Sequence, residues 1–339
     1  MNRLRRALYL LAASLILTIV ALAVRALFAT GAFTTVSHHF DGTCAIVGGA
    51  ARDLVVDEKD GLIFASQPGG LAVARLGQLQ KGFTRLAGTP SHFEPRGLGL
   101  FRSNDGAAVL MAIERPADDD AAIETFDVHL SNANATLVER SRITSGLLSD
   151  PAAVVAVGPD QFYVTNASTS RTSLGRFLEA FARVPRGNVV FFDGTVFRPV
   201  VNGFSGASGI EVSADLSHVY VGTRLGRTLY AFERNPFSGG LKELGELQVG
   251  VAIEAVRRDG NGDLWIAGHP DSIEMPGVSR KTGASEIFRV VLRGGIPEAA
   301  DLIYSDPGTA FSTAGVGALS GGRLIIGSPA SATQVCKFG

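Results

Sequence analysis

A short apolar strand pattern recurs six times along the chain, and this repeat constrains the fold more than any other feature. Each copy begins at a turn containing Gly, Asp or Ser and ends in a small or polar residue. The copies begin roughly 45 to 60 residues apart, the spacing of four-stranded propeller blades. The sequence therefore predicts an all-β fold, a six-bladed β-propeller. The copies are Gly61–Ser66, Ala107–Ile113, Asp160–Asn166, Ser217–Gly222, Gly262–Gly268 and Gly322–Gly327.

Each copy has an apolar strand before it and an alternating strand after it. Alternation of period two suits a blade strand that packs one face on each neighbouring blade. We expect the preceding strands to be innermost, with their leading residues facing the central channel. A two-sheet sandwich with similar turn spacing is the alternative, but six complete copies favour the propeller. The leading residues are Asp53, Gly97, Asp150, Ser208, Glu254 and Thr313, and the alternating strands are Leu71–Leu76, Ile123–Leu130, Asn188–Phe192, Thr228–Glu233, Glu286–Leu292 and Gln334–Phe338.

The N-terminus carries three arginines before an apolar run from Ala7 to Val24. A basic flank followed by about 18 uncharged residues is typical of a signal peptide or a signal anchor. The length favours a retained anchor, although Ala29–Ala32 leaves cleavage, and hence secretion, open. We predict a cytoplasmic flank and transmembrane helix over residues 1–30, a linker over 31–43 and the propeller over 44–339. The propeller is expected on the extracytoplasmic side of the membrane.

The chain has two cysteines, Cys44 before the first innermost strand and Cys336 in the last strand. A ring must bring its two ends together, and a disulfide is the natural state of two such thiols in an oxidising compartment. We therefore expect a Cys44–Cys336 bond across the seam of the ring. The alternative is two unrelated buried cysteines.

The charge balance and the motifs exclude several function classes. Thirty-one basic and 32 acidic residues give a net charge of −1, so nothing favours a nucleic acid as a partner. The chain has neither a Gly-x-Ser-x-Gly elbow nor a His-Glu-x-x-His helix. These absences argue against a serine hydrolase of that type and against a zinc protease.

Three stretches resemble the paraoxonase/arylesterase family: Ser149–Asn166, Gly262–Pro270 and Ala284–Val290. The placing of the two cysteines is similar as well. The resemblance implies a six-bladed propeller with two calcium ions in its central tunnel. It also implies hydrolysis of lactones, aryl esters and sometimes organophosphates, so that a small ester or lactone is the expected ligand.

The resemblance implies separate ligands for each calcium ion. At the positions of the buried, structural ion stand Asp53, Asp150 and the backbone carbonyl of Leu98. Oxygen ligands of this kind suit calcium, so one structural ion is expected here. The alternative is that both aspartates cap strand ends or turns.

The positions of the catalytic calcium ion have changed. Of the side-chain ligands only Glu254 keeps a carboxylate, since Arg52, Ser149 and Ser208 stand at other ligand positions. Arginine can neither coordinate a cation nor act as a base near neutral pH. A catalytic calcium ion is therefore not expected.

Arginines also stand at the positions of the family's histidine pair, Arg96 and Arg115. We expect Arg52 and Arg96 to replace the charge of the ion and to pair with Glu211 and Glu254, because buried opposite charges must pair. Such a pocket would still bind an anionic or carbonyl-bearing ligand through arginine. The expected catalytic positions are Arg52, Arg96 and Glu254, and the expected ligand-binding residues are Glu211, Ser208, Ser149 and His269.

Two classes of function remain open after these comparisons. The first is an ester or lactone hydrolase of the arylesterase type with a remodelled site. The second is a non-catalytic, membrane-anchored propeller that serves as a ligand-binding or interaction module. A metal-free relative resembling strictosidine synthase is a third option. Fold alone does not decide among them, because function depends on the site.

Overall fold

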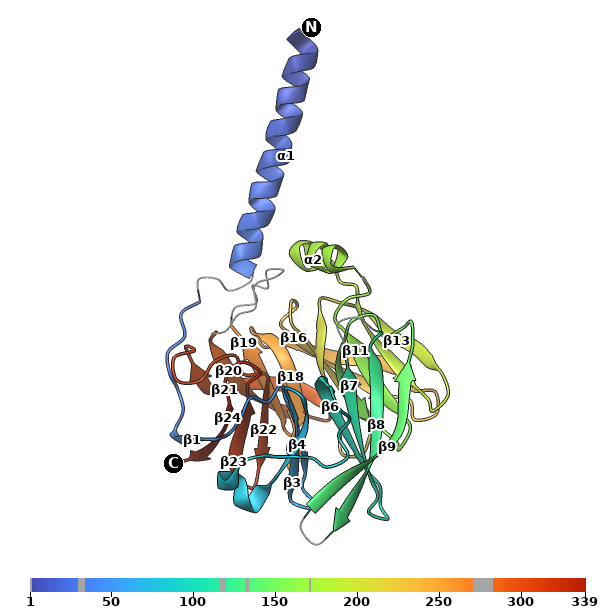
Figure 1. The fold of residues 1–339 in the computed structure, drawn as a ribbon. Coiled ribbons are helices and arrows are strands. Elements are labelled where there is room, and N and C mark those ends of the chain that lie inside the picture. Colours follow the sequence, from blue (N-terminus) through green and yellow to red (C-terminus); the bar gives the residue numbers. More distant parts are fainter. Residues whose placement is uncertain (1, 30–33, 116–119, 132–133, 171, 271–282) are drawn as a thin grey trace.

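The computed structural model describes residues 2–29, 34–115, 120–131, 134–170, 172–270 and 283–339. Six four-stranded antiparallel sheets stand around a common centre (Figure 1), so the predicted six-bladed propeller is confirmed. The first three blades are β2 (Asp53–Asp57), β3 (Leu62–Gln67), β4 (Gly70–Arg75) and β5 (Thr84–Arg85); β6 (Pro95–Arg102), β7 (Ala108–Glu114), β8 (Ala122–Ser131) and β9 (Asn134–Thr144); and β10 (Pro151–Ala156), β11 (Phe162–Asn166), β12 (Gly187–Phe192) and β13 (Phe197–Phe204).

The remaining blades follow the same order, except that the last is completed by the N-terminal strand. They are β14 (Ala207–Val212), β15 (His218–Thr223), β16 (Thr228–Arg234) and β17 (Leu241–Gln248); β18 (Ala252–Arg258), β19 (Leu264–His269), β20 (Ser285–Arg293) and β21 (Ile296–Asp306); and β22 (Val316–Ser320), β23 (Arg323–Gly327), β24 (Thr333–Phe338) and β1 (Gly42–Gly48).

The predicted order of strands within the blades is also confirmed. The six repeat copies form the second strand of each blade, and the strands before them are innermost. Each innermost strand contacts the innermost strand of the next blade, and β22 contacts β2, which closes the ring. The apolar core lies between blades: Phe64 of the first blade packs in one buried cluster with Leu110 and Phe126 of the second. This packing is the reason for the period-two alternation.

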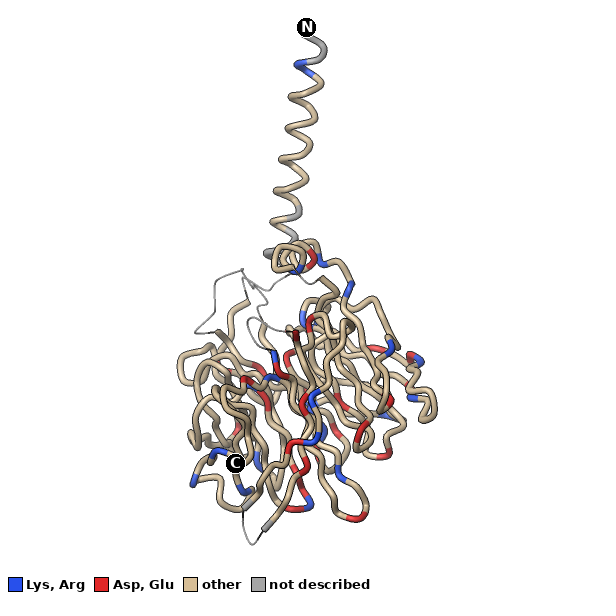
Figure 2. Tube along the Cα trace, turned by 45° about the vertical axis from the view of Figure 1, so that its right-hand side comes forward, with Lys and Arg blue, Asp and Glu red and all other residues tan. Residues whose placement is uncertain are grey.

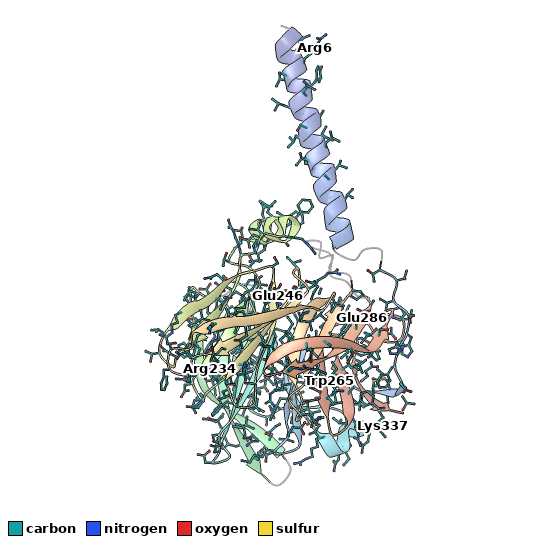
Figure 3. All side chains as sticks on the ribbon, turned by 180° about the vertical axis from the view of Figure 1, so that it is seen from behind. Arg6, Arg234, Glu246, Trp265, Glu286 and Lys337 are labelled. Carbon is teal, nitrogen blue, oxygen red and sulfur yellow. A yellow bond between two sulfur atoms is a disulfide. The ribbon has the colours of Figure 1, made fainter. Side chains whose placement is uncertain are left out.

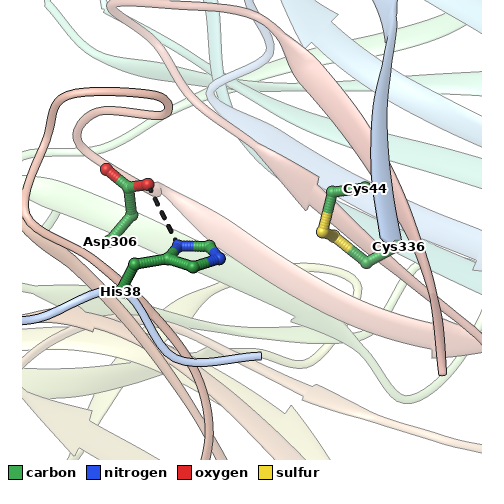
Figure 4. Close-up of a disulfide and its surroundings, with 4 residues drawn as sticks. All are labelled: His38, Cys44, Asp306 and Cys336. Carbon is green, nitrogen blue, oxygen red and sulfur yellow. Dashed lines mark ion pairs between the residues drawn. A yellow bond between two sulfur atoms is a disulfide. The ribbon is translucent and has the colours of Figure 1, made fainter. Parts of the chain in front are cut away.

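The seam joins the two ends of the chain through β1 and β24. Cys44 and Cys336 are directly opposed in this antiparallel pair and form the predicted disulfide (Figure 4), with a Cα–Cα distance of 4.0 Å. The segment before β1 is also attached, since His38 Nδ1 lies 3.5 Å from a carboxylate oxygen of Asp306. His39 and Ser305 form an isolated antiparallel bridge. The seam thus combines backbone pairing with a covalent bond.

In the described residues, two α-helices and one short 3₁₀ helix accompany the strands. The predicted N-terminal helix is present as α1 (Asn2–Ala29), which projects away from the ring and is uncharged along its middle in Figure 2. Arg6 lies near its free end, far from Trp265 inside the ring (Figure 3). In the part of the chain that the structure describes, no helix combines the length and hydrophobicity required to cross a bilayer. The others are α2 (Ser173–Ala182) and η1 (Leu76–Lys81).

Candidate functional site

The residues predicted to face the channel gather where the innermost strands begin. Pro151 at the start of β10 pairs with Asn166 at the end of β11, and α2 follows β11. The beginnings of the innermost strands therefore lie on the face of the ring that carries α2 (Figure 1). The first two blades are tied together here, since the hydroxyl of Ser66, opposite Asp53 in β3, donates to the carbonyl of Arg96 in β6 at 2.8 Å. We call this end of the channel the mouth.

Four innermost strands have irregular pairing close to the mouth. Regular pairing is interrupted between Pro95 and Leu98 in β6, between Pro151 and Ala153 in β10, between Ala207 and Ile210 in β14, and between Ile253 and Ala255 in β18. Such bulges insert unpaired residues and re-aim side chains, often beside active sites. Arg96, Ser208 and Glu254 all lie in these interruptions.

Two of the bulges need glycine because neighbouring blades approach closely. A Cβ atom on Gly97 would lie 2.9 Å from the carbonyl oxygen of Ala152, and one on Gly209 would lie 2.7 Å from the backbone nitrogen of Val256. Both contacts are with backbone atoms, which cannot turn aside as a side chain would. The glycines thus let the bulged strands pack around a narrow channel.

Glu254 is held between a guanidinium group and an imidazole at the mouth. Arg224, in the loop after β15, donates to its Oε2 at 2.7 Å. His269, the last residue of β19, has its Nε2 4.0 Å from Oε1 of the same carboxylate. The Nδ1 of His269 lies 2.9 Å from the carbonyl oxygen of Ala284. A carbonyl only accepts, so Nδ1 carries the proton and Nε2 is left with its lone pair in the neutral ring.

The two serines predicted to bind a ligand are hydrogen-bonded within the protein. Ser208 is fully buried, and its hydroxyl donates to the carbonyl of Ile253 at 2.5 Å, which ties β14 to β18. The hydroxyl of Ser149 donates to the carbonyl of Ser168 at 2.7 Å, in the loop that leads to α2. Both hydroxyls thus support the shape of the mouth.

The predicted pairing of Arg52 and Arg96 with Glu211 and Glu254 is wrong. Among the described residues, Glu254 contacts Arg224 and His269, and neither Arg52 nor Arg96 is paired with it. Glu211 accepts a hydrogen bond from its neighbouring backbone N–H in β14. Removal from water raises the pKa of Glu211, and Arg257 opposes this rise.

Arg52 and Arg96 instead form a concentration of positive charge at the mouth. Arg52 is exposed and Arg96 is half-buried. Burial lowers the pKa of Arg96, and the nearby guanidinium groups of Arg52 and Arg115 lower it further, while Asp150 opposes them. Guanidinium groups that influence one another in this way favour an anion or a developing negative charge beside them.

Below the mouth, a buried ion pair crosses the tunnel between the fifth and first blades. Arg257 of β18 places one terminal nitrogen 2.5 Å from each carboxylate oxygen of Asp53. The same nitrogen lies 3.2 Å from the carbonyl oxygen of Leu98. The Nε of Arg257 donates to the carbonyl of Leu54 at 2.7 Å. Asp53 also accepts the backbone N–H of Leu54 and of Leu98, each at 2.8 Å.

This arrangement does not fit the structural calcium ion predicted at Asp53, Asp150 and Leu98. The Arg257 guanidinium lies between the Asp53 carboxylate and the Leu98 carbonyl, where the ion would have to bind. Asp150 is bound to Arg115. A divalent ion would therefore meet a fixed positive charge at both carboxylates. In the described ranges, no group of three or more His, Cys, Asp or Glu side chains could hold a metal.

Arg224 and Arg257 are the residues that the sequence analysis missed. Arg257 had a signal, because it is a charged residue within an otherwise largely apolar innermost strand. No sequence pattern indicated Arg224, because it lies in a loop and its contact with Glu254 depends on how the fourth and fifth blades pack.

A second group of acids lies around Arg142 on the second blade. Arg142 Nε lies 3.3 Å from Glu124 and 3.4 Å from Glu114. Burial, followed by the carboxylates of Glu114 and Glu139, raises the pKa of Glu124 from an ordinary 4.5 to about 7. The folded protein thus binds this proton more tightly than the unfolded chain does. The stability gained from this bound proton is complete below the pKa that Glu124 has in the unfolded chain. It is lost as the pH rises through about 7.

We therefore expect the melting temperature to fall between pH 5 and pH 8, and the E124Q variant to lose much of that fall. Thermal unfolding of both proteins across this pH range measures the difference. Parallel pH profiles for E124Q and the unchanged protein would show that another group is responsible.

Comparisons with known proteins agree with this architecture. The family model described as Arylesterase matches residues 78–338. Serum paraoxonase/arylesterase 1 of Rattus norvegicus is 27% identical over 78% of this chain and 75% of that protein. Serum paraoxonase/lactonase 3 of Homo sapiens is 25% identical over 73% of this chain and 69% of that protein.

Solved structures support the fold at low sequence identity. A luciferin-regenerating enzyme superposes with a TM-score of 0.55 at 10% identity, covering 87% of this chain and 95% of that one. A gluconolactonase from Xanthomonas campestris also has a TM-score of 0.55, at 15% identity, covering 88% and 90%. At these identities the likeness concerns the propeller alone.

Proposed function

Since the chain belongs to the arylesterase family, we propose that it hydrolyses carboxylic esters or lactones at the mouth of the channel. The observation that carries this proposal is the group formed by Glu254, His269 and Arg224. A free imidazole nitrogen, an adjacent carboxylate and nearby guanidinium groups are the components that ester hydrolysis needs.

In this proposal His269 is the general base. The hydrogen bond of Nδ1 to the Ala284 carbonyl fixes the tautomer and leaves Nε2 to take a proton from water. The hydroxide so formed attacks the carbonyl carbon of the ester. When the carbon–oxygen bond to the leaving group breaks, His269 returns the proton to the leaving oxygen. The products are a carboxylic acid and an alcohol, or one hydroxy acid from a lactone.

Glu254 stabilises the imidazolium that exists between these two proton transfers. Its Oε1 lies 4.0 Å from Nε2, which is beyond direct hydrogen-bond distance but close enough to stabilise the cation electrostatically. Arg224 holds the carboxylate in position at 2.7 Å.

Arg52 and Arg96 supply positive charge for the oxyanion of the tetrahedral intermediate. Positive charge placed beside a developing oxyanion in a partly dehydrated site lowers the energy of the transition state. This stabilisation is commonly the largest single contribution to the rate of such reactions. This role explains why two guanidinium groups are tolerated close together at the mouth.

A ligand-binding module is the second candidate function. It is favoured by the changed ligand positions and by the buried Asp53–Arg257 pair between the first and fifth blades. In that case the arginines would bind an anionic ligand without turnover.

Assays of the purified full-length protein with phenyl acetate, γ-lactones and δ-lactones separate the two functions. Each substrate should be tested with calcium and with chelator. We expect turnover that chelator leaves unchanged, because the proposed steps use side chains alone. Absence of turnover on all three classes, in protein that melts cooperatively, would contradict hydrolysis and leave the binding module.

The attachment of the chain to a membrane through α1 is part of the same proposal. The large apolar side chains of α1 are exposed, for example Leu11 at 68% and Leu15 at 62%. The disulfide at the seam supports an extracytoplasmic propeller. Charged side chains in this apolar stretch would oppose its entry into lipid, so L11R/L15R should shift the protein from the membrane fraction to the soluble fraction. F237R changes an exposed apolar residue of the propeller and is the control; equal fractionation of both variants would contradict the anchor.

A further inference from the structure

The centre of the ring contains one guanidinium group that binds oxygens of two other innermost strands. Arg257, itself in β18, contacts the Asp53 carboxylate and the Leu54 carbonyl of β2 and the Leu98 carbonyl of β6. Both charged side chains are almost completely buried, at 7% and 8% exposure. These contacts connect the fifth, first and second blades at the axis of the ring.

The ligand atoms around this guanidinium are those that a hard cation prefers. They are carboxylate and carbonyl oxygens that converge from separate strands. Arginine differs from a metal ion in three respects: it carries one positive charge, it is covalently attached, and it remains protonated in proteins. One carboxylate therefore balances it, and no chelator can remove it.

The second carboxylate of the predicted metal site is balanced in the same way. Asp150 lies at the entry to β10 and pairs with Arg115, which follows β7. Each acid thus has its own fixed cation, so that the two-carboxylate site divides into two single ion pairs. A divalent ion bound by Asp53 would have to displace the Arg257 guanidinium and would leave that buried charge without a carboxylate, which is strongly unfavourable.

We infer that Arg257 is an internal cation that takes the place of a divalent metal at the centre of this propeller, so that the ring holds together without one. The group joins the strands whose oxygens a metal would otherwise crosslink. This inference concerns folding and metal content, and its readouts are metal content and melting temperature rather than turnover, so its failure and the failure of the proposed hydrolysis can be told apart.

The first test measures the unchanged full-length protein. Metal analysis after purification should find less than about 0.1 calcium per chain, and chelator or millimolar calcium should move the melting temperature by less than about 1 °C, since a ligand that does not bind the native state cannot stabilise it. Stoichiometric calcium, or a fall of several degrees in chelator, would overturn the inference.

The second test removes the guanidinium group of Arg257. R257A leaves the Asp53 carboxylate and the Leu98 carbonyl without the guanidinium, so we expect a lower melting temperature that millimolar calcium partly restores. D53N/R257A removes the carboxylate as well and should show no response to calcium. R258A is the matched control: Arg258 is the next residue, but its Nε binds the Val212 carbonyl at 3.1 Å, so its melting temperature should stay indifferent to calcium.

A third variant keeps the inference testable if R257A does not fold. D53N/R257Q replaces both charges with amides of similar size, and it should be more stable than R257Q alone because no buried carboxylate is left unpaired. If R257Q is as stable as the unchanged protein, or if calcium stabilises R257A and R258A equally, Arg257 does not replace a metal.

Discussion

Replacing both Cys44 and Cys336 with serine is expected to lower the free energy of unfolding by up to about 5–6 kcal/mol in the chain-entropy account. The bond joins residues separated by 292 positions, so its loss frees almost the whole propeller in the unfolded state. It also leaves the closure of the sixth blade to noncovalent contacts, such as the backbone pairing of β1 with β24. Denaturant unfolding of the double variant, compared with the unchanged protein, measures the effect.

Reduction of the unchanged protein is the control for this prediction. Chemical reduction removes the same crosslink without changing any residue, so the reduced protein and C44S/C336S should unfold at the same denaturant concentration. The double variant is preferable to either single one, which would leave a free thiol. A midpoint equal to that of the oxidised protein would show that strand pairing alone closes the ring.

Substituting His269 with glutamine is expected to lower kcat by about 10²–10⁴, the usual contribution of a general base. Glutamine is polar and of similar size, but its amide has no basic nitrogen and cannot take a proton from water. KM should change little, because His269 acts on the water rather than binding the substrate. Steady-state kinetics on the best substrate of the ester and lactone panel provide this comparison.

H129Q is the matched control, since His129 is exposed on β8 of the second blade. It should retain the activity of the unchanged protein. Melting temperatures separate loss of chemistry from loss of fold, and H269Q should melt within a few degrees of the unchanged protein. If H269Q keeps full activity, the base is another group and the role proposed for Glu254 also fails.

Much of the propeller could be predicted because its determinants are local. The period-two alternation of side chains in Leu71–Leu76 and Thr228–Glu233 indicates that both faces of a blade strand are covered. The turns between strands depend on neighbouring residues. The seam could also be predicted, since a ring must join its ends and the cysteines stand in the two segments that meet. Cys44 and Cys336 indeed lie opposite one another in the last blade.

The candidate site could be predicted only as a set of positions. Arg52, Arg96, Asp53, Asp150 and Glu254 could be assigned to the channel, but not their partners. Bulges near the mouth change the register within β6 and β18, and a one-residue change of register turns a side chain to the other face. The partner of Glu254 was therefore predicted incorrectly.

The sequence by itself determined that this chain forms six blades, which strand of each blade is innermost, and where the ring closes. These properties follow from short-range periodicity and from the geometry of any closed ring. Only the tertiary structure decided which charges meet inside it. Asp53 and Arg257 are 204 residues apart, and their contact exists because ring closure brings the first and fifth blades to a common axis, where a buried carboxylate must take the nearest cation.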